Sequence, residues 1–465
     1  MSAGSVLITT AGSVRGLDLG DVTAYLGVPY AAPPVGERRW AAPERVEPWS
    51  GVRDAVAFGP APPQPERPIG VWSHGAVGSD DEDCLSLNVW TPAGGVPAHG
   101  RPVLVWLHGG GWAVGFSGSQ VFDGAALAVA ADAVVVTINY RLGSLGWLNH
   151  SSLGANWGLQ DMAAALAWVR DNAAAFGGDP DAVTAWGQSA GAGSVLHLLG
   201  SPLGEGLFAR AIAQSPPLGE VTVPRERGEA WAEALGAQVR DGPFAVESLR
   251  DVPARAIVDF HEALLATAEF RGTRGGAMPV EDPATLPADP RKVPGSRIKI
   301  PVMIGTTTDE ATFLFRAGGR VLDPDDGRLE AMVAHLPDVA GAEQAVVEIE
   351  QERARGARDN NAVLCRLATH HLFLLPVVEW TAARRRAGGE VLEYRVGFSS
   401  PDSGLGATHT IDVPLVFGTY DTEIGARVTG GGERAKEASE QMIAAVREFV
   451  RGRAPWAPDS INQFG

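Results

Sequence analysis

A Gly-x-Ser-x-Gly pattern at residues 187–191 places Ser189 where a nucleophilic hydroxyl group could act. The residues at 183–186 are apolar or β-prone, and small, helix-compatible residues follow at 192–200. A serine on a sharp turn between a buried strand and a helix projects its hydroxyl outward, and flanking glycines give the turn room. The chain has 58 glycines, so the pattern alone is weak evidence and an ordinary turn would produce it as well. The chemistry that it would serve is acyl transfer.

Acyl transfer also needs hydrogen-bond donors for the oxyanion of the tetrahedral intermediate. Three consecutive glycines, at 109–111, follow an apolar stretch at 103–107 that we expect to be a buried strand. Consecutive glycines let bare N–H groups converge on one oxygen atom, although a flexible turn has the same composition. The position of this loop ahead of the serine turn favours an oxyanion hole formed by the N–H groups of Gly110, Gly111 and Ala190.

A serine nucleophile needs a histidine base and an acid that orients the base. Asp309 and Glu310 both follow a predicted strand at 301–304, and spacing alone does not choose between them. Among the ten histidines, His409 lies in a loop after the last predicted strand. The order nucleophile, acid, histidine matches hydrolases whose serine lies on a strand-to-helix turn. A histidine base ordinarily titrates near pH 6.5, so activity is expected to rise with pH between 5 and 8.

Metal chemistry is not indicated. Cys365, His370 and His371 lie close together in the sequence, but their helical, apolar setting and their spacing do not match a metal-ligand pattern. We expect them to be core or rim residues, and we expect no metal and no cofactor.

The elements that must position these residues alternate between short β-rich runs and amphipathic helices. This alternation predicts an α/β fold with a central, mostly parallel, twisted sheet flanked by helices. Two helical stretches, 220–295 and 316–386, are expected to be insertions that cap the active-site edge of the sheet within one domain of residues 1–465. The predicted strands lie at 85–90, 103–107, 134–138, 183–186, 211–213, 301–304 and 391–396, and the main helices at 158–174 and 433–451.

Composition limits the possible partners. A net charge of −17 and a pI near 5.1 argue against nucleic-acid binding, which draws on clustered basic residues. There is no uninterrupted apolar run of membrane-spanning length, and the best stretch, 364–378, is broken by polar residues and a proline. The amino terminus does not look like a secretion signal, and two cysteines do not make a disulfide framework. We therefore expect a cytoplasmic protein whose partners are a small-molecule substrate and water.

Several motifs together resemble the carboxylesterase/cholinesterase family of α/β-hydrolases, most closely the bacterial carboxylesterases of the para-nitrobenzyl esterase kind. They run in the family's order over most of the chain, at 26–34, 82–90, 139–143, 176–180 and 211–215. The resemblance implies an α/β-hydrolase fold and hydrolysis of carboxylic esters by a Ser-His-Glu triad. It also favours Glu310 as the acid and leaves Asp309 as the cap of a helix.

Departures from the family pattern refine this expectation. Pro62 stands where many relatives have a cysteine, so Cys84 is expected to be a free thiol in the core. Gln188 stands where many relatives have a glutamate, which argues against a cationic choline ester as substrate. The resemblance also implies a structural ion pair between Arg39 and Glu82.

The substrate is expected to be a neutral, fairly apolar carboxylic ester. Trp112, Phe116 and Phe313 could line an acyl or alcohol pocket, although aromatic residues at such positions equally pack in cores. Trp72 is expected to pack in the core or a loop and not to bind choline. An amidase, a thioesterase or a carbamate hydrolase with the same triad is an alternative, as is, more remotely, a non-catalytic binding protein on the cholinesterase scaffold.

Overall fold

The computed structural model describes residues 2–65, 80–239, 242, 245–267, 275–293, 298–316, 321–401, 403–458 and 460–465. Trp72 lies outside these residues. In the described part of the chain, twelve strands form one sheet, in the order β1-β2-β3-β5-β7-β6-β8-β9-β10-β11-β12, with β4 beside β2. The strands are β1 Ser2–Ile8, β2 Ser13–Asp18, β3 Val22–Pro29, β4 Val52–Asp54, β5 Ser86–Pro92, β6 Arg101–Leu107, β7 Val134–Ile138, β8 Gly178–Gln188, β9 Arg210–Gln214, β10 Val302–Thr307, β11 Val391–Val396 and β12 Ile461–Phe464.

The half of the sheet that would carry the chemistry is parallel. From β7 through β6, β8, β9, β10 and β11 to β12, every neighbouring pair is parallel, whereas β1, β2, β3, β5 and β7 pair antiparallel in that order. The predicted mostly parallel sheet is therefore confirmed. The carboxyl ends of parallel strands meet at one edge, so side chains that follow β8, β10 and β11 come together there.

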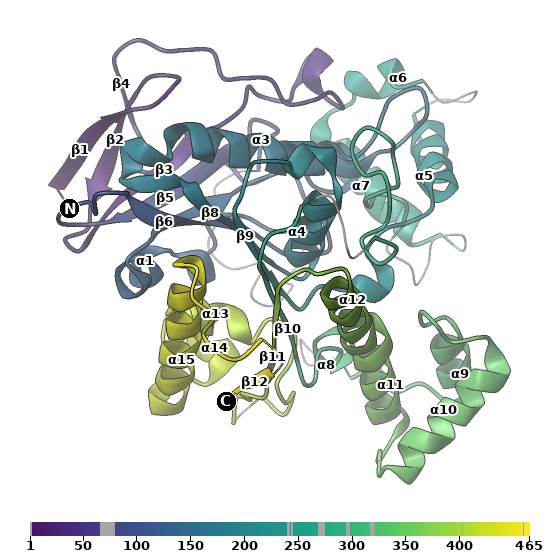
Figure 1. Ribbon diagram of the computed structural model, residues 1–465. Coiled ribbons are helices and arrows are strands. Elements are labelled where there is room, and N and C mark those ends of the chain that lie inside the picture. Colours follow the sequence, from purple (N-terminus) through teal and green to yellow (C-terminus); the bar gives the residue numbers. More distant parts are fainter. Residues whose placement is uncertain are drawn as a thin grey trace.

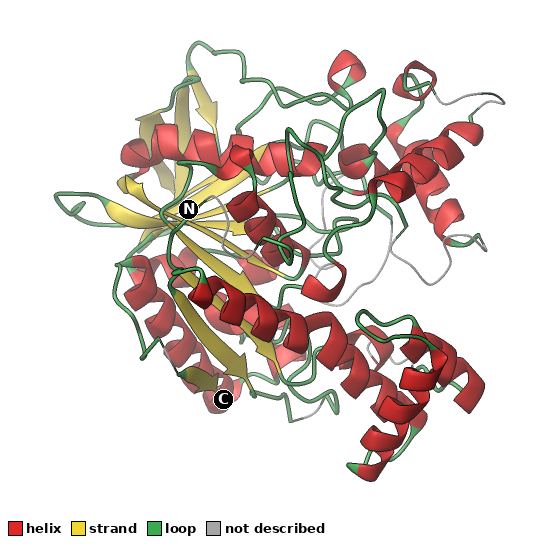
Figure 2. Ribbon diagram, turned by 45° about the vertical axis from the view of Figure 1, so that its right-hand side comes forward, coloured by secondary structure: helices red, strands yellow, loops and turns green. Residues whose placement is uncertain are grey.

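Helices cover both faces of this twisted sheet (Figures 1 and 2). One face packs against α3 Trp157–Asn172, α4 Ala190–Gly200 and α12 Leu375–Arg386, and the other against α1 Ala125–Ala131, α13 Asp412–Phe417 and α15 Gly432–Val450. Side chains of β6 alternate between the two cores: Val103 and Val105 enter the first, Leu104 and Trp106 the second. This alternation is why the strand reads as a continuous apolar run in the sequence.

Both stretches that we predicted to be helical insertions contain helices among their described residues. The first contains α5 Arg225–Ala237, α6 Glu247–Arg250 and α7 Ala254–Leu265, and the second α9 Asp326–Ala334, α10 Ala342–Ala354, α11 Asn360–Thr369 and α12. A π-helical turn, His370–Leu374, joins α11 to α12. The remaining short helices are α2 Gly143–Trp147, α8 Thr312–Arg316 and α14 Glu423–Thr429.

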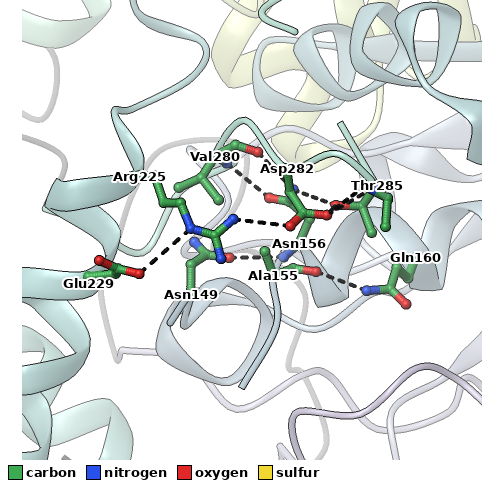
Figure 3. A network of polar contacts seen from close by, with 10 residues as sticks. Asn149, Ala155, Asn156, Gln160, Arg225, Glu229, Val280, Asp282 and Thr285 are labelled. Carbon is green, nitrogen blue, oxygen red and sulfur yellow. Dashed lines mark hydrogen bonds and ion pairs between the residues drawn. The ribbon is translucent and has the colours of Figure 1, made fainter. Parts of the chain in front are cut away.

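A buried polar network fixes the first insertion to the body of the protein (Figure 3). Asn156, just before α3, donates from Nδ2 to the carbonyl of Val280 at 2.8 Å and accepts from the Val280 N–H at 2.9 Å. Beside it, Asp282 binds Arg225 of α5 at 3.2 Å and accepts from the Thr285 N–H at 3.0 Å. The buried bonds of Asn156 favour one arrangement of the insertion relative to α3, and the half-buried pair of Arg225 and Asp282 adds to them.

One described helix, Asn360–Arg386, has the length and composition of a membrane-crossing helix. Of its most apolar window, 61% is buried inside the protein, as in the core helix of a globular domain, so composition alone is weak evidence for a span. Near the end of this helix, the buried Arg384 donates to the backbone carbonyl of Ile300 at 2.9 Å.

Candidate active site

Ser189 lies on a strained turn between β8 and α4. Its φ and ψ angles are 55° and −125°, which few residues other than glycine adopt. Glycine is required beside it, because a Cβ atom on Gly191 would lie 1.9 Å from the carbonyl oxygen of Leu107. This strained turn places the serine at the carboxyl edge of the sheet, as the Gly-x-Ser-x-Gly pattern predicted.

The glycine loop after β6 faces this turn. A Cβ atom on Gly109 would come 3.0 Å from Cβ of Ser189, so the loop backbone approaches the serine directly. Gly110 and Gly111 have φ angles of 110° and 63°, conformations that favour glycine. In the described part of the chain, no hydrogen bond uses the N–H groups of Gly110, Gly111 or Ala190. These groups remain available as donors.

Glu310 and His409, which the resemblance implied as acid and base, contact each other. Glu310 Oε2 contacts Nδ1 of His409, and both side chains are buried, with exposed fractions of 0% and 4%. The second oxygen of Glu310 accepts the N–H of Thr307 at 2.8 Å, at the end of β10. This bond fixes the carboxylate plane, so that one oxygen points at the backbone and the other at the imidazole.

Asp309 does not contact His409. Its Oδ2 accepts the N–H of Ala407 at 3.0 Å and the hydroxyl of Thr308 at 2.8 Å. We expected Asp309 to cap a helix, and that prediction is wrong. The carboxylate instead ties the β10 loop to the loop that carries His409.

Gln188 is a site residue that sequence reasoning noted only for its missing charge. Its side-chain nitrogen lies 3.1 Å from Nε2 of His409, the nitrogen that a serine proton would reach. Among the described residues no hydrogen bond joins Ser189 to His409, so in this state the amide of Gln188 occupies that position. The side chain is buried, and its Oε1 atom has no partner in the described part of the chain.

Two phenylalanine rings flank the imidazole of His409. The centroid of Phe313 lies 6.0 Å and that of Phe373 lies 5.1 Å from the centroid of His409. Phe373 belongs to the π-helical turn, which the sequence did not predict. Such turns occur frequently at functional sites because the extra residue redirects the side chains around it.

The other two aromatic residues predicted for the substrate pocket are deeply buried. Trp112 has no exposed surface, and its indole N–H donates to the hydroxyl of Ser194 at 2.9 Å. Phe116 is 7% exposed and packs edge-on against Phe58 at 6.1 Å. Of the three, Phe313 is the one beside the imidazole.

Other buried histidines have structural settings. His108 stacks on Tyr140 with 4.4 Å between centroids, and burial lowers the pKa of its imidazole to about 4. His371 pairs with Glu348 at 2.6 Å. Among the described residues no group of three or more His, Cys, Asp or Glu side chains could hold a metal ion.

Two further expectations are confirmed. Arg39 donates from Nε to Glu82 at 2.7 Å and forms the ion pair implied by the resemblance. Cys84 is a free, buried thiol, as is Cys365.

Comparison with known proteins shows the family and the fold. The model of the carboxylesterase family matches residues 3–463. The chain is 35% identical over 423 residues to the para-nitrobenzyl esterase of Bacillus subtilis (strain 168), covering 90% of this chain and 83% of that protein. It is 37% identical over 432 residues to the phenmedipham hydrolase of Pseudarthrobacter oxydans, covering 91% and 84%. A solved structure of a thermophilic para-nitrobenzyl esterase superposes with a TM-score of 0.86 at 32% identity, covering 98% of this chain and 92% of that one.

The chain therefore belongs to the carboxylesterase family and has the α/β-hydrolase fold. It is a carboxylic ester hydrolase.

Proposed function

We propose that this protein is a serine carboxylesterase that hydrolyses neutral, fairly apolar carboxylic esters through an acyl-enzyme on Ser189. The observation that carries the proposal is the contact of Glu310 with His409 at the edge of the sheet where β8 ends at the strained serine. In this proposal Ser189, His409 and Glu310 form the catalytic triad.

Attack begins when the imidazole of His409 turns its free Nε2 to the Ser189 hydroxyl. Glu310 holds the proton on Nδ1, which leaves a lone pair on Nε2 for the serine proton. Gln188 must yield this position, because its amide nitrogen now lies 3.1 Å from Nε2. As the serine oxygen adds to the ester carbonyl, negative charge develops on the carbonyl oxygen, and the N–H groups of Gly110, Gly111 and Ala190 stabilise it.

Collapse of the intermediate releases the alcohol, which takes the proton from His409, and leaves the acyl group on Ser189. Water then enters, gives a proton to His409 and attacks the acyl carbon. The second collapse returns the proton to Ser189 and releases the acid. The triad is regenerated without any cofactor.

The surroundings of His409 support a neutral, apolar ester. Phe313 and Phe373 present rings to the imidazole, and Gln188 is uncharged where a carboxylate would attract a cationic substrate. Two free, buried thiols, Cys84 and Cys365, support a reducing, cytoplasmic setting for the enzyme.

Gly110→Ala tests the oxyanion hole. An alanine Cβ would lie 1.9 Å from the carbonyl oxygen of Val114, so the loop must move. Its N–H groups would then no longer point at the oxyanion. We expect kcat to fall by about 100- to 1,000-fold, as when one oxyanion donor is lost. The measurement is steady-state kinetics on a p-nitrophenyl ester, with the thermal midpoint recorded in parallel.

Gly94→Ala, in the loop after β5 and outside the proposed site, is the matched control, because Gly94 also has a positive φ (92°) and its Cβ would meet nothing within 4 Å. A Gly110→Ala enzyme that folds and keeps its kcat within a few-fold of the parent would contradict the assignment.

Substrate class is tested with p-nitrophenyl esters of increasing acyl length beside cationic and anionic esters of equal size. We expect kcat/KM to be highest for the neutral esters and to rise with acyl length until the pocket is filled, because apolar burial contributes about 0.8 kcal/mol per methylene. A preference for either charged series would refute the neutral, apolar assignment.

An amidase, a thioesterase or a carbamate hydrolase would use the same triad, so the leaving group decides between them. One relative is named phenmedipham hydrolase, and that compound belongs in the panel together with matching anilides and thioesters. Faster turnover of any of these than of the best ester would reassign the reaction.

A further inference from the structure

A second buried carboxyl group, Asp412, lies behind the acid–base pair. It is the first residue of α13, three residues after His409, and only 1% of it is exposed. Burial, and then the negative charge of Glu310, raises the pKa of Asp412 to about 6. The ester mechanism above does not use this group.

The hydrogen bonds around Asp412 fix its orientation. Trp186 of β8 has an indole N–H, which can only donate, and it donates to the side-chain oxygen of Gln214 at the end of β9. The amide nitrogen of Gln214 therefore faces Asp412 and donates to Oδ2 at 2.6 Å. The other oxygen, Oδ1, is buried without a partner in the described part of the chain. A buried oxygen without a donor disfavours the ionised carboxylate.

The charged groups that face Asp412 come from three elements. Glu310 follows β10 and adds negative charge, while His409 lies in the loop before α13 and lowers the pKa of Asp412 when it is charged. Tyr394 of β11 has a pKa raised by burial and by both carboxyl groups, so it stays neutral. The neighbouring Arg395 is bound to Glu393 at 2.8 Å. The imidazole of His409 is therefore the group that can bring a positive charge next to Asp412 and Glu310.

We propose that Asp412 is a positioning residue that holds a proton beside Glu310 at low pH and releases it to solvent in the working range, thereby setting how strongly the acid pair stabilises the imidazolium of His409. The inference rests on the proposed triad. With Asp412 neutral, the imidazolium faces one carboxylate; with Asp412 ionised, it faces two. The base becomes stronger as Asp412 loses its proton.

The test is the pH profile of kcat/KM for Asp412→Asn. Asparagine keeps an oxygen for the Gln214 donor and places an NH₂ group where the acid proton would be, so it mimics the neutral acid at every pH. In the parent enzyme we expect kcat/KM to fall, on the acid side of its pH profile (the acid limb), more steeply than a single ionisation would produce. In the variant we expect a limb of single slope, with a midpoint lower by about half a unit or more and a several-fold lower plateau.

Asp309→Asn is the matched control. It removes a carboxylate one residue from Glu310, but Asp309 is partly exposed and water screens its charge. We expect its limb to keep the midpoint and slope of the parent. A limb for Asp412→Asn that coincides with that of the parent would overturn the proposal, whatever its plateau.

A second measurement does not need activity. Because the pKa of Asp412 is higher in the folded chain than in the unfolded chain, the folded state binds more protons between about pH 4 and pH 6, and this group's contribution to stability falls as pH rises through that window. The thermal midpoint of Asp412→Asn relative to the parent should therefore increase from pH 5 to pH 8. A difference independent of pH would refute the proton on Asp412, whereas activity retained by Ser189→Ala would refute the triad instead.

Should Asp412→Asn fail to fold, Gln214→Met tests the same point. It withdraws the donor from Oδ2 and keeps Asp412 protonated to higher pH, so its acid limb should lose the extra steepness below pH 7. An unchanged limb in that variant counts against the proposal.

Discussion

Replacing Ser189 with alanine is expected to lower kcat by about six orders of magnitude, because the nucleophile and its proton transfer are lost together. Alanine takes the same backbone angles with the same strain as serine, so folding should be unaffected. The measurement is ester turnover by purified variant, with reaction of a fluorophosphonate probe as an independent readout. The parent should be labelled at this serine and the variant should not.

Ser194→Ala separates chemistry from stability. Ser194 lies five residues further along, in α4, and accepts the indole N–H of Trp112 at 2.9 Å. Its loss leaves a buried donor unpaired, which costs about 1–3 kcal/mol of stability, while probe labelling should persist. Turnover by Ser189→Ala within about a hundredfold of the parent, set against the million-fold loss that the triad requires, would remove Ser189 from the mechanism.

Replacing Glu310 with glutamine is expected to lower kcat by about four orders of magnitude while leaving the shape of the site intact. The Thr307 N–H, 2.8 Å from Oε1, needs an oxygen, so the amide NH₂ of glutamine must face Nδ1 of His409. Nδ1 then has to accept, which puts the imidazole proton on Nε2. An imidazole protonated at Nε2 cannot take the serine proton.

Asp309→Asn serves as the control for this change too, because asparagine still offers an oxygen to the Ala407 N–H. We expect its kcat to stay within about tenfold of the parent, since a surface-accessible hydrogen bond contributes about 1 kcal/mol. If Asp309→Asn lost as much activity as Glu310→Gln, the choice of Glu310 as the acid would be wrong. Single-turnover kinetics would show that acylation is the slowed step.

In the parallel half of the sheet, strands β6 to β11 could be predicted because they are largely buried on both faces and read as apolar runs. Strand β12 was missed, because most of its residues are exposed or half-buried. Residues 134–138 were predicted to be a strand, and β7 has those bounds. Strands β1 to β4 were missed, because they are partly or wholly exposed and their sequence pattern is short and irregular. β4, for example, has three residues, and all are exposed.

The candidate site was predictable where backbone geometry restricts the residue type. Gly191 permits no side chain, so the serine turn requires glycine and can be recognised in the sequence. The choice between Asp309 and Glu310 could not be recognised in this way, because both precede the same helix, and it came from the family resemblance.

Contacts made by the tertiary fold were not predictable. Phe373 reaches His409 through a π-helical turn, and Trp112 turns into the core although it follows the glycine loop. Asp412 reads as an ordinary residue at the start of a helix. Only its position behind Glu310 reveals a buried acid.

The distribution of the proposed triad over β8, the β10 loop and the segment after β11 has a consequence for synthesis of the protein. A chain emerging from the ribosome completes the serine turn and the acid long before residue 409, and the sheet gains β11 and β12 last. Until then the nascent chain carries the proposed nucleophile without its base. Cellular esters therefore cannot acylate the serine while the hydrophobic faces of the chain are still uncovered.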